Sequence, residues 1–503
     1  MVRLDQEIRI QNAASTNVVN GDGGPALHGG ITPLEVRPSD GMSVKLQLAG
    51  RAEWHAARIW RLSPLAIEIV WDTKLPFLTL ETTIQLEVLA GATRAAMQGT
   101  VSAKWNEQGR DIVGFAFAAP SADPADGASD QRRGQRMRSP LDLAPLGRAE
   151  NPLRFADIVY FSIRDIAPSG MQFVCSTRNR TLVPGLELDA VISFPEGAPV
   201  PLRFVIRHVR VSSDSDGQTQ RLAVGARFVS PSAAAREAIG QYALRFGSVS
   251  PTTLTTSGIT PSSVRRAVDF GFSETEDDYD AVVALRRLAY SAAGKVRTDD
   301  GDQGVADAFD KRARILVAKH HGRVIASMRL IFHGPGEAME HEQFTSLPDG
   351  SPPREDMVEI TRVCTHPDYR RGDLLAGLLV HAAQTVMETG RPWLVGSSTT
   401  KLLRIYTRIG CRPTATTYRH AHLGNEDHVI FFGHIPSMIS GKHVGPVVWN
   451  GLFRELFWFM KERGVLPVER RDRLRIRYYA LWAPLARYLQ RRASQPKRAR
   501  KRA

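Results

Sequence analysis

The sequence predicts a multidomain α+β protein in which two small antiparallel β-barrels or sandwiches precede an α/β domain and a basic helical extension. Three observations support this prediction. Segments of small and polar residues at 121–131 and 248–263 divide the chain into three main blocks. The first two blocks repeat each other as short alternating strands. The third block instead alternates helical and strand spacing, which is typical of an α/β layer fold.

These boundaries give six predicted segments. They are a flexible leader at 1–30, a β domain at 31–120, a second β domain at 131–247, a linker at 248–264, an α/β domain at 265–440, and a basic helical extension with its tail at 441–503.

The internal repeat is visible when IWRLSPLAIEIVW is aligned with SIRDIAPSGMQFV, which brings Pro64 onto Pro168. Both copies continue into alternating strands. They close on similar phrases, VGFAFAAPSA and VGARFVSPSA. Because start, middle and end all correspond, we expect two copies of one β fold.

In the third block the spacing of apolar residues changes from the strand period to a mixture of helical and strand periods. We predict a helix over 277–291, a hairpin around His321 and Gly322, and a strand in MVEITRVCTHP. A helix ending at Gly390, the strand WLVGSS and a helix ending at Gly410 follow.

The composition is that of a globular protein, with 43% hydrophobic and 23% charged residues among 503. The three cysteines lie far apart, so neither a disulfide framework nor a zinc site is expected. The first residues lack the apolar core of a signal peptide, and no stretch of about 18 uncharged apolar residues occurs. We therefore predict a cytoplasmic protein without a metal.

The net charge of +14 is concentrated at one end. Residues 451–503 contain 16 Arg or Lys and 4 Asp or Glu. Two predicted helices there combine aromatic and basic residues, which suits peripheral contact with the inner face of a membrane. The alternative is that these helices pack on the protein and only the last residues form a basic tail. Nucleic acid is a third and less favoured partner.

The second block carries two short motifs. Arg132 and Arg136 are spaced as RxxxR, and a turn 30 residues later has Asp165 and Gly170. These residues resemble the PilZ family, whose RxxxR arm and D/NxSxxG turn lie on a six-stranded barrel. The resemblance implies binding of cyclic di-GMP, because Arg forks bind phosphates and stack on guanine. The ligand-binding residues that the resemblance implies are Arg132, Arg133, Arg136, Asp165, Ala167 and Gly170.

Two departures qualify this resemblance. Ala167 stands where the family has Ser, which removes a hydroxyl contact. In the first block the turn reads RLSPLAIEI, without an RxxxR arm before it. We therefore expect the first β domain to be a PilZ-like module that binds no nucleotide and packs on its neighbours instead.

In the third block, EITRVCTHPDYRRGDLLAGLL resembles the central strand and helix of the GNAT superfamily. Glu359 and Arg362 fit the E-x-S/T-R element of N-acyl amino acid synthases and acyl-homoserine-lactone synthases. The resemblance implies Glu359 as the base, with a structural ion pair to Arg362 or Arg329 as the alternative. It also implies Tyr406 as the acid that protonates the leaving thiolate, with a plain core aromatic as the alternative. Supporting residues that look like the subfamily are Arg287 (or Arg286), Asp307, Asp310 and Arg329.

The turn before the predicted helix is the expected donor site, formed by Arg370, Arg371, Gly372, Asp373, Leu374 and Leu375. A helix N-terminus cradles phosphate. GNAT enzymes that use coenzyme A have two glycines where this chain has Asp373 and Leu375. Side chains there crowd the backbone, which favours acyl carrier protein, with its single phosphate, over coenzyme A.

The predicted function is therefore a cyclic-di-GMP-responsive N-acyltransferase. It would move a fatty acyl group from an acyl carrier protein or acyl-CoA thioester to a primary amine such as an amino acid. No resident cofactor is expected, because the thioester is a substrate and cyclic di-GMP an allosteric ligand. The alternative is a non-catalytic adaptor that binds cyclic di-GMP and an acyl carrier or another protein.

Overall fold

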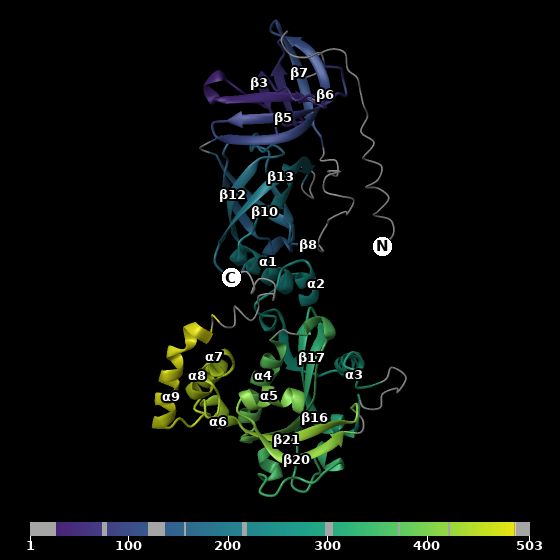
Figure 1. Ribbon diagram of the computed structural model, residues 1–503, viewed down its shortest axis with the longest axis vertical. Helices are drawn as coiled ribbons and strands as arrows, with labels where there is room; N and C mark the ends of the chain where they lie inside the picture. Colours follow the sequence, from purple (N-terminus) through teal and green to yellow (C-terminus); the bar gives the residue numbers. More distant parts are fainter. Residues whose placement is uncertain are drawn as a thin grey trace. The chain divides into compact units, whose positions relative to one another are not determined.

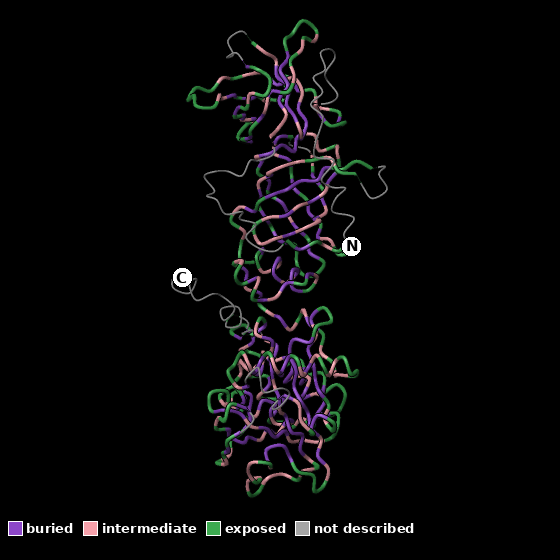
Figure 2. Tube along the Cα trace, turned by 90° about the vertical axis from the view of Figure 1, so that its right-hand side faces the viewer, coloured by how far each residue is buried: buried purple, intermediate pink, exposed green. Residues whose placement is uncertain are grey.

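The computed structural model describes residues 27–72, 78–118, 136–154, 157–213, 219–296, 305–370, 373–420, 423–486 and 488. The chain divides into two compact units, residues 1–238 and 239–503. Figure 1 shows the helices and strands of both units. Buried residues gather inside each barrel and around the sheet of the second unit (Figure 2).

The first barrel closes six strands in the order β3-β2-β5-β6-β7-β4, and β4 pairs back onto β3. A short strand, β1, adds to β3. Alternating side chains such as Val44, Leu46 and Ile59 fill the interior. The strands are β1 (Leu34–Glu35), β2 (Met42–Leu48), β3 (His55–Leu62), β4 (Ala66–Val70), β5 (Thr83–Ala90), β6 (Thr93–Glu107) and β7 (Arg110–Phe117).

The second barrel repeats this topology as β10-β9-β12-β13-β14-β11, closed between β11 and β10. Pro64 and Pro168 lie in the equivalent turns β3–β4 and β10–β11, which confirms the repeat seen in the sequence. A short strand, β8, pairs with β10. The strands are β8 (Met137–Arg138), β9 (Leu146–Glu150), β10 (Ile158–Ala167), β11 (Gly170–Ser176), β12 (Glu187–Ser193), β13 (Val200–Ser213) and β14 (Gln220–Phe228).

A seven-stranded sheet forms the centre of the second unit, in the order β15-β16-β17-β18-β19-β21-β20. Only β18 and β19 pair in parallel, and the other neighbours are antiparallel. The strands are β15 (Asp269–Phe272), β16 (Ala313–His320), β17 (Arg323–Phe332), β18 (Met357–Thr365), β19 (Trp393–Thr399), β20 (Arg412–His420) and β21 (Glu426–His434).

Helices cover both faces of this sheet. On one face α4 packs its apolar side against β17 and β18, and on the other α3 packs against the same strands. The helices are α1 (Ala233–Phe246), α2 (Pro251–Thr256), α3 (Glu276–Ser291), α4 (Leu374–Glu388), α5 (Thr400–Arg408), α6 (Ile435–Ile439), α7 (Pro446–Leu452), α8 (Arg454–Glu462) and α9 (Arg470–Leu481). Helix α1 crosses the boundary between the units.

The predicted elements of the third block are confirmed. The hairpin β16–β17 turns at His321 and Gly322, both with positive φ, as a two-residue type I′ turn requires. Gly390 follows α4 at φ 75° and Gly410 follows α5 at φ 104°, so both glycines end their helices in the left-handed region.

The predicted linker at 248–264 is instead part of the second unit. Ser250 caps α2, and Leu254, Ile259 and Val264 are buried. In the predicted extension at 441–503, Trp449 and its neighbours on α7 and α8 complete the core beside α4, which agrees with the alternative that these helices pack on the protein. Among the described residues, no helix is long and apolar enough to cross a membrane.

Candidate active site

The parallel strands β18 and β19 separate part way along their length. Their pairing runs from Met357 with Trp393 to Ile360 with Gly396, although the strands continue to Thr365 and Thr399. Backbone N–H and C=O groups beyond the last pair are therefore available to a bound molecule. Thr361 and Ser397 are the first residues past it, and both are partly exposed.

A β-bulge lies at this point of β18. Its register against β17 shifts between Ser327 and Arg329, and Arg362 adopts φ 51°. The left-handed region is unfavourable for a residue other than glycine, so surrounding contacts must hold it. The Arg362 guanidinium donates to Asp307 at 2.8 Å and pairs with Glu340 at 3.1 Å. The bulge thus carries a fixed cation beside the opening.

A buried charge network supports that cation. Fully buried Arg329 donates to Glu340 at 2.7 Å, to Asp310 at 2.9 Å and to Asp307 at 2.5 Å. Arg286, also fully buried, pairs with Asp310 at 2.8 Å. Burial alone would raise the pKa of Asp310, but hydrogen bonds and charge from the two arginines hold it below its usual value. Removing one partner of such a network costs about 3–5 kcal/mol.

Glu340 is the acidic centre of the network. Burial would raise its pKa, but His420, whose Nε2 lies 3.7 Å from the carboxylate, and the charges of Arg362 and Arg329 hold the pKa well below its usual range. The carboxylate that pairs with Arg329 and Arg362 is therefore Glu340, the first residue of a short 3₁₀ helix at Glu340–Gln343.

Glu359 occupies a separate pocket beside this network. His333 Nε2 and His341 Nδ1 each lie 2.9 Å from its carboxylate oxygens, and the Glu340 backbone N–H donates to it at 3.0 Å. Burial would raise the pKa of Glu359, but these hydrogen bonds lower it to about 2. With 1% of its surface exposed, Glu359 is a fixed anion and a weak proton acceptor at neutral pH.

His341 is one of the two histidines that contact Glu359. Its Nδ1 faces Glu359, whereas its buried Nε2 has no hydrogen-bond partner among the described residues. A carboxylate on one ring nitrogen fixes the tautomer and the orientation of the ring. The pair Glu359–His341 therefore has the arrangement of an oriented base.

Tyr406 lies on the other face of the sheet. Its ring stacks on Phe431 at 4.4 Å, and the Phe431 ring lies 2.9 Å from where a side chain on Gly396 would begin. Tyr406 is thus one ring away from the end of the β18–β19 pairing. Burial raises the pKa of Tyr406 to about 12, which keeps the hydroxyl protonated.

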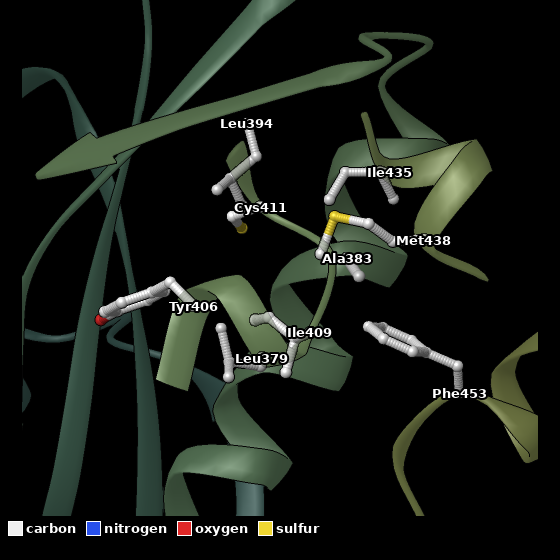
Figure 3. Close-up of a pocket in the computed structure, with 9 residues that line it drawn as sticks. All are labelled: Leu379, Ala383, Leu394, Tyr406, Ile409, Cys411, Ile435, Met438 and Phe453. Carbon is white, nitrogen blue, oxygen red and sulfur yellow. The ribbon is translucent and has the colours of Figure 1, made fainter. Parts of the chain in front are cut away.

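Tyr406 also borders an apolar cavity of about 10 Å³, too small for an acyl chain. Figure 3 shows its hydroxyl directed away from the other eight side chains of the cavity wall. Leu379 and Ala383 lie on α4, Leu394 on β19, and Ile435 and Met438 on α6. The other three lie between elements, Ile409 and Cys411 between α5 and β20 and Phe453 between α7 and α8.

The turn before α4 differs from the expected donor site. The Asp373 carboxylate accepts hydrogen bonds from the Ser263 hydroxyl at 2.7 Å and from the backbone N–H groups of Val264 and Arg265 at 2.7 and 2.9 Å. Asp373 therefore fastens the preceding segment to α4, and its charge is partly balanced there. Leu374 is buried in the core.

The remaining donor-site residues are placed as follows. The Arg370 guanidinium donates to the Ala289 carbonyl at 2.9 Å, and Leu375 packs partly buried against the core. Arg371 and Gly372 lie outside the described residues.

Of the predicted site residues, Asp307, Asp310, Arg329 and Arg362 come together in one charge network, and Glu359 lies in the pocket beside it. Arg286 rather than Arg287 reaches Asp310. Glu340, His333, His341 and His420 were not predicted. Three of them stand in or beside the segment HGPGEAMEHEQF, whose glycine and proline give no helical or strand period. Its one signal is the density of Glu and His.

A second candidate site lies on the outside of the second barrel. Arg136 approaches Asp165 at 3.7 Å, and β8 pairs with β10 at Asp165. Gly170 faces the backbone of β14, where an added Cβ would lie 2.3 Å from the Ala226 carbonyl oxygen. Ala167 pairs with Gly170 at the turn. Arg132 and Arg133 lie outside the described residues.

The strand register extends this site into a row across four strands. Asp165 pairs with Gln172, Gln172 with Gly225, and Gly225 with His208. The His208 ring covers Gly225, where an added Cβ would meet it at 2.1 Å. Burial, then the charges of Arg210 and Arg136, lower the pKa of His208, so these arginines lie near the same row.

The equivalent turn of the first barrel is filled from within. His28 is buried and hydrogen-bonds to the Ser63 hydroxyl at 2.8 Å and to Glu68 at 2.7 Å. Arg61 pairs with Glu68 at 3.3 Å. These polar groups satisfy one another and leave the turn closed.

Comparison with known proteins agrees with this fold. Residues 285–380 match the family described as acetyltransferase (GNAT) domain. No curated protein matches the chain.

Among solved structures, the chain is similar to FeeM, an N-acyl amino acid synthase from uncultured soil microbes, at 12% identity, over 34% of this chain and 94% of that one, with TM-score 0.29. A putative N-acetyltransferase from Lactobacillus plantarum has 19% identity, coverage of 33% and 98%, and TM-score 0.26. MrkH of K. pneumonia in its apo state has 14% identity, coverage of 41% and 86%, and TM-score 0.21. These likenesses are too distant to decide an activity or a ligand. Residues 285–380 are thus a GNAT domain, in a chain that also contains two closed six-stranded barrels.

Proposed function

We propose that the second unit transfers an acyl group from a thioester to a primary amine, such as that of an amino acid. The observation that carries this proposal is the opening between β18 and β19. A buried network with Arg362 and Glu340 lies on one side of the sheet there, and Tyr406 approaches from the other. Acyl transfer needs a base for the amine, stabilisation of the oxyanion and an acid for the thiolate.

The proposed roles follow from the contacts. Glu359 orients His341, whose Nε2 takes the proton from the attacking amine, directly or through water. The carbon–nitrogen bond then forms, and the tetrahedral oxyanion is stabilised by backbone N–H groups at the bulge. As the carbon–sulfur bond breaks, the Tyr406 hydroxyl protonates the thiolate. This assignment moves the base from Glu359 to His341, because a carboxylate with pKa about 2 is a poor acceptor.

We further propose an acyl carrier protein as the donor's carrier. The support is the sequence at the α4 N-terminus, where Asp373 and Leu375 occupy positions that coenzyme A enzymes fill with glycine. The Asp373 carboxylate would repel a phosphate there only weakly, because Ser263 and the following backbone engage it. The support for a carrier protein is therefore that the Asp373 and Leu375 side chains crowd the backbone at the α4 N-terminus.

The test is mass spectrometry after incubating the full chain with acyl carrier protein thioesters, or matched acyl-CoA, and pooled amino acids. A new N-acyl product is expected, with a higher kcat/KM for the carrier-protein donor. Glu359→Gln and His341→Gln should both reduce kcat about 100-fold or more. Absence of product with every donor would favour a non-catalytic adaptor, and equal use of both donors would refute the carrier preference alone.

We also propose that the second barrel binds cyclic di-GMP and thereby controls the transfer. Support comes from Arg136 beside Asp165, because Arg binds phosphate and stacks on planar rings, and from the adjoining row that ends at His208. Calorimetry with cyclic di-GMP tests this. Arg136→Ala and Arg132→Ala should each weaken binding at least tenfold, while Arg58→Ala in the first barrel should leave it unchanged. Unaltered affinity in the two second-barrel variants would make this barrel purely structural.

A further inference from the structure

Helix α9 is fixed to the second unit by one face. The Tyr479 hydroxyl donates to the carbonyls of Val444 at 2.8 Å and Gly441 at 3.2 Å, and Asn450 donates to the Tyr479 carbonyl at 2.7 Å. The buried residues of α9 and of the helical turn after it are spaced by four, seven and three positions, namely Asp472, Ile476, Ala483 and Ala486. This anchoring determines which face of α9 points outward.

The outward face carries a line of apolar and aromatic side chains among its arginines. Leu474 and Leu481 are 65% and 75% exposed, and the other members of the stripe are also exposed. Leu474, Tyr478 and Leu481 lie on one line along α9, opposite its buried face, and Leu485 and Tyr488 continue the same spacing in the helical turn after it. We call this line the α9 stripe, and it consists of Leu474, Tyr478, Leu481, Leu485 and Tyr488.

Arginines flank the α9 stripe. At 100° per residue, Arg471 falls on one side of the stripe and Arg473 and Arg477 on the other, and all three are exposed. The sequence then continues through 489–503 with seven Lys or Arg and no Asp or Glu. An outward apolar line between cations is the pattern of a helix that lies in the plane of a membrane surface.

Helix α8 presents the same combination. Trp458 and Phe459 are exposed, Lys461 Nζ lies 4.5 Å from the Trp458 ring, and Arg463 lies 4.5 Å from the Phe459 ring. Tryptophan and tyrosine, apolar at one end and polar at the other, suit the headgroup region of a bilayer.

We propose that the α9 stripe docks this protein onto anionic membrane surfaces, with Leu474 and Leu481 entering the acyl boundary and the arginines contacting lipid phosphates. Charge complementarity and the apolar line together favour a bilayer. A nucleic acid backbone offers no apolar partner for five outward side chains, and an acidic protein would need an apolar groove about 20 Å long to cover them. The inference concerns where the protein works, so it does not require the proposed acyl transfer.

The test is co-sedimentation of the full chain with vesicles of phosphatidylcholine alone or with 30 mol % phosphatidylglycerol, in about 0.1 M salt. Binding is expected only to the anionic vesicles. The double variant Leu474→Ser/Leu481→Ser should weaken it at least about 100-fold, from roughly tenfold per leucine. Arg473→Gln/Arg477→Gln should weaken it about 25-fold, from roughly fivefold per charge. The matched control is Leu141→Ser, which alters an equally exposed leucine (75%) in the first unit.

Several outcomes would overturn the proposal. These are no binding to anionic vesicles, equal binding to neutral ones, or loss of binding only in the arginine variant, which would indicate a charge contact without insertion. Vesicle binding by the wild type that Leu474→Ser/Leu481→Ser leaves intact would place the surface elsewhere. Acyl transfer to a soluble amine is expected to persist in this variant, so failure of docking and failure of the enzyme proposal are distinguishable.

Discussion

The charge of Glu359 is built into the fold, because His333, His341 and a backbone N–H surround its carboxylate. Its pKa is lower in the folded protein, at about 2, than the ordinary 4.5. The group therefore contributes stability above pH 4.5, and that contribution is lost as the pH falls from 4.5 toward 2.

The prediction is a loss of up to about 3 kcal/mol in the free energy of unfolding of the second unit over this window. Glu359→Gln should lower stability at pH 7 and flatten the dependence below pH 4.5. Urea denaturation between pH 6 and pH 3 measures both. An equally steep decline in Glu359→Gln would show that Glu359 does not supply this stability.

Tyr406 provides the second prediction at this scale. Tyr406→Phe removes the proposed acid but keeps the ring that stacks on Phe431, so kcat should fall about 100-fold while the melting temperature stays close to wild type. A thioester with a more acidic thiol needs less protonation and should restore most of the lost rate. Full activity of Tyr406→Phe on an ordinary thioester would make Tyr406 a plain core aromatic.

Single residues were predictable from sequence where they stand in regular elements. Glu359 and Arg362 could be found because the strand around them has a recognisable motif. The partners of these residues could not. Glu340 and His341 come from a segment without period, and only the folded chain brings their side chains under β18.

At the scale of elements, the C-terminal helices belong to the core of the second unit. Trp449 on α7 is 1% exposed, contacts Phe457 and Tyr479, and donates its indole N–H to the Ile439 carbonyl at 2.8 Å. Trp449→Ala should therefore destabilise the unit by about 3–5 kcal/mol. The matched control is Trp458→Ala, at a site 42% exposed, which should change stability by about 0.5 kcal/mol or less. Thermal unfolding compares them, and similar melting temperatures would contradict this packing.

The β10–β11 turn gives a prediction for the second barrel. Gly170→Ala would force a Cβ to 2.3 Å from the Ala226 carbonyl oxygen, so the strands must shift. We expect a loss of about 1–3 kcal/mol in stability together with loss of nucleotide binding. Arg136→Ala, at an exposed side chain, should lose binding without that destabilisation. Denaturation and calorimetry on both variants separate fold from contact, and a stable Gly170→Ala barrel would contradict the packing.

Helices and strands whose apolar residues recur at regular spacing were predicted correctly. The segment 248–264, which is held in place by polar contacts, was not. The segment 248–264 resembles a linker because it is rich in Ser and Thr. Its order comes from Ser250, which caps α2, and from Asp373, which is far away in sequence. Composition alone does not contain that partner.

At the scale of the whole molecule, the internal repeat predicted two copies of one β fold, and both barrels close with the same strand order. The boundaries of the second unit were harder to place. Its core includes Trp449 and Met460 from the segment predicted as an extension. The sequence does not distinguish these cases, because an apolar helix has the same residue pattern whether it binds a membrane or a neighbouring helix.

The central claim is acyl transfer at the opening between β18 and β19. Its most direct test follows two quantities in one reaction of the full chain with an acyl thioester and excess amine, namely free thiol released and N-acyl product formed. The account predicts their appearance in a 1:1 ratio, and loss of both in His341→Gln. Thiol release without N-acyl product would indicate hydrolysis, and unchanged transfer by His341→Gln would contradict the proposed site.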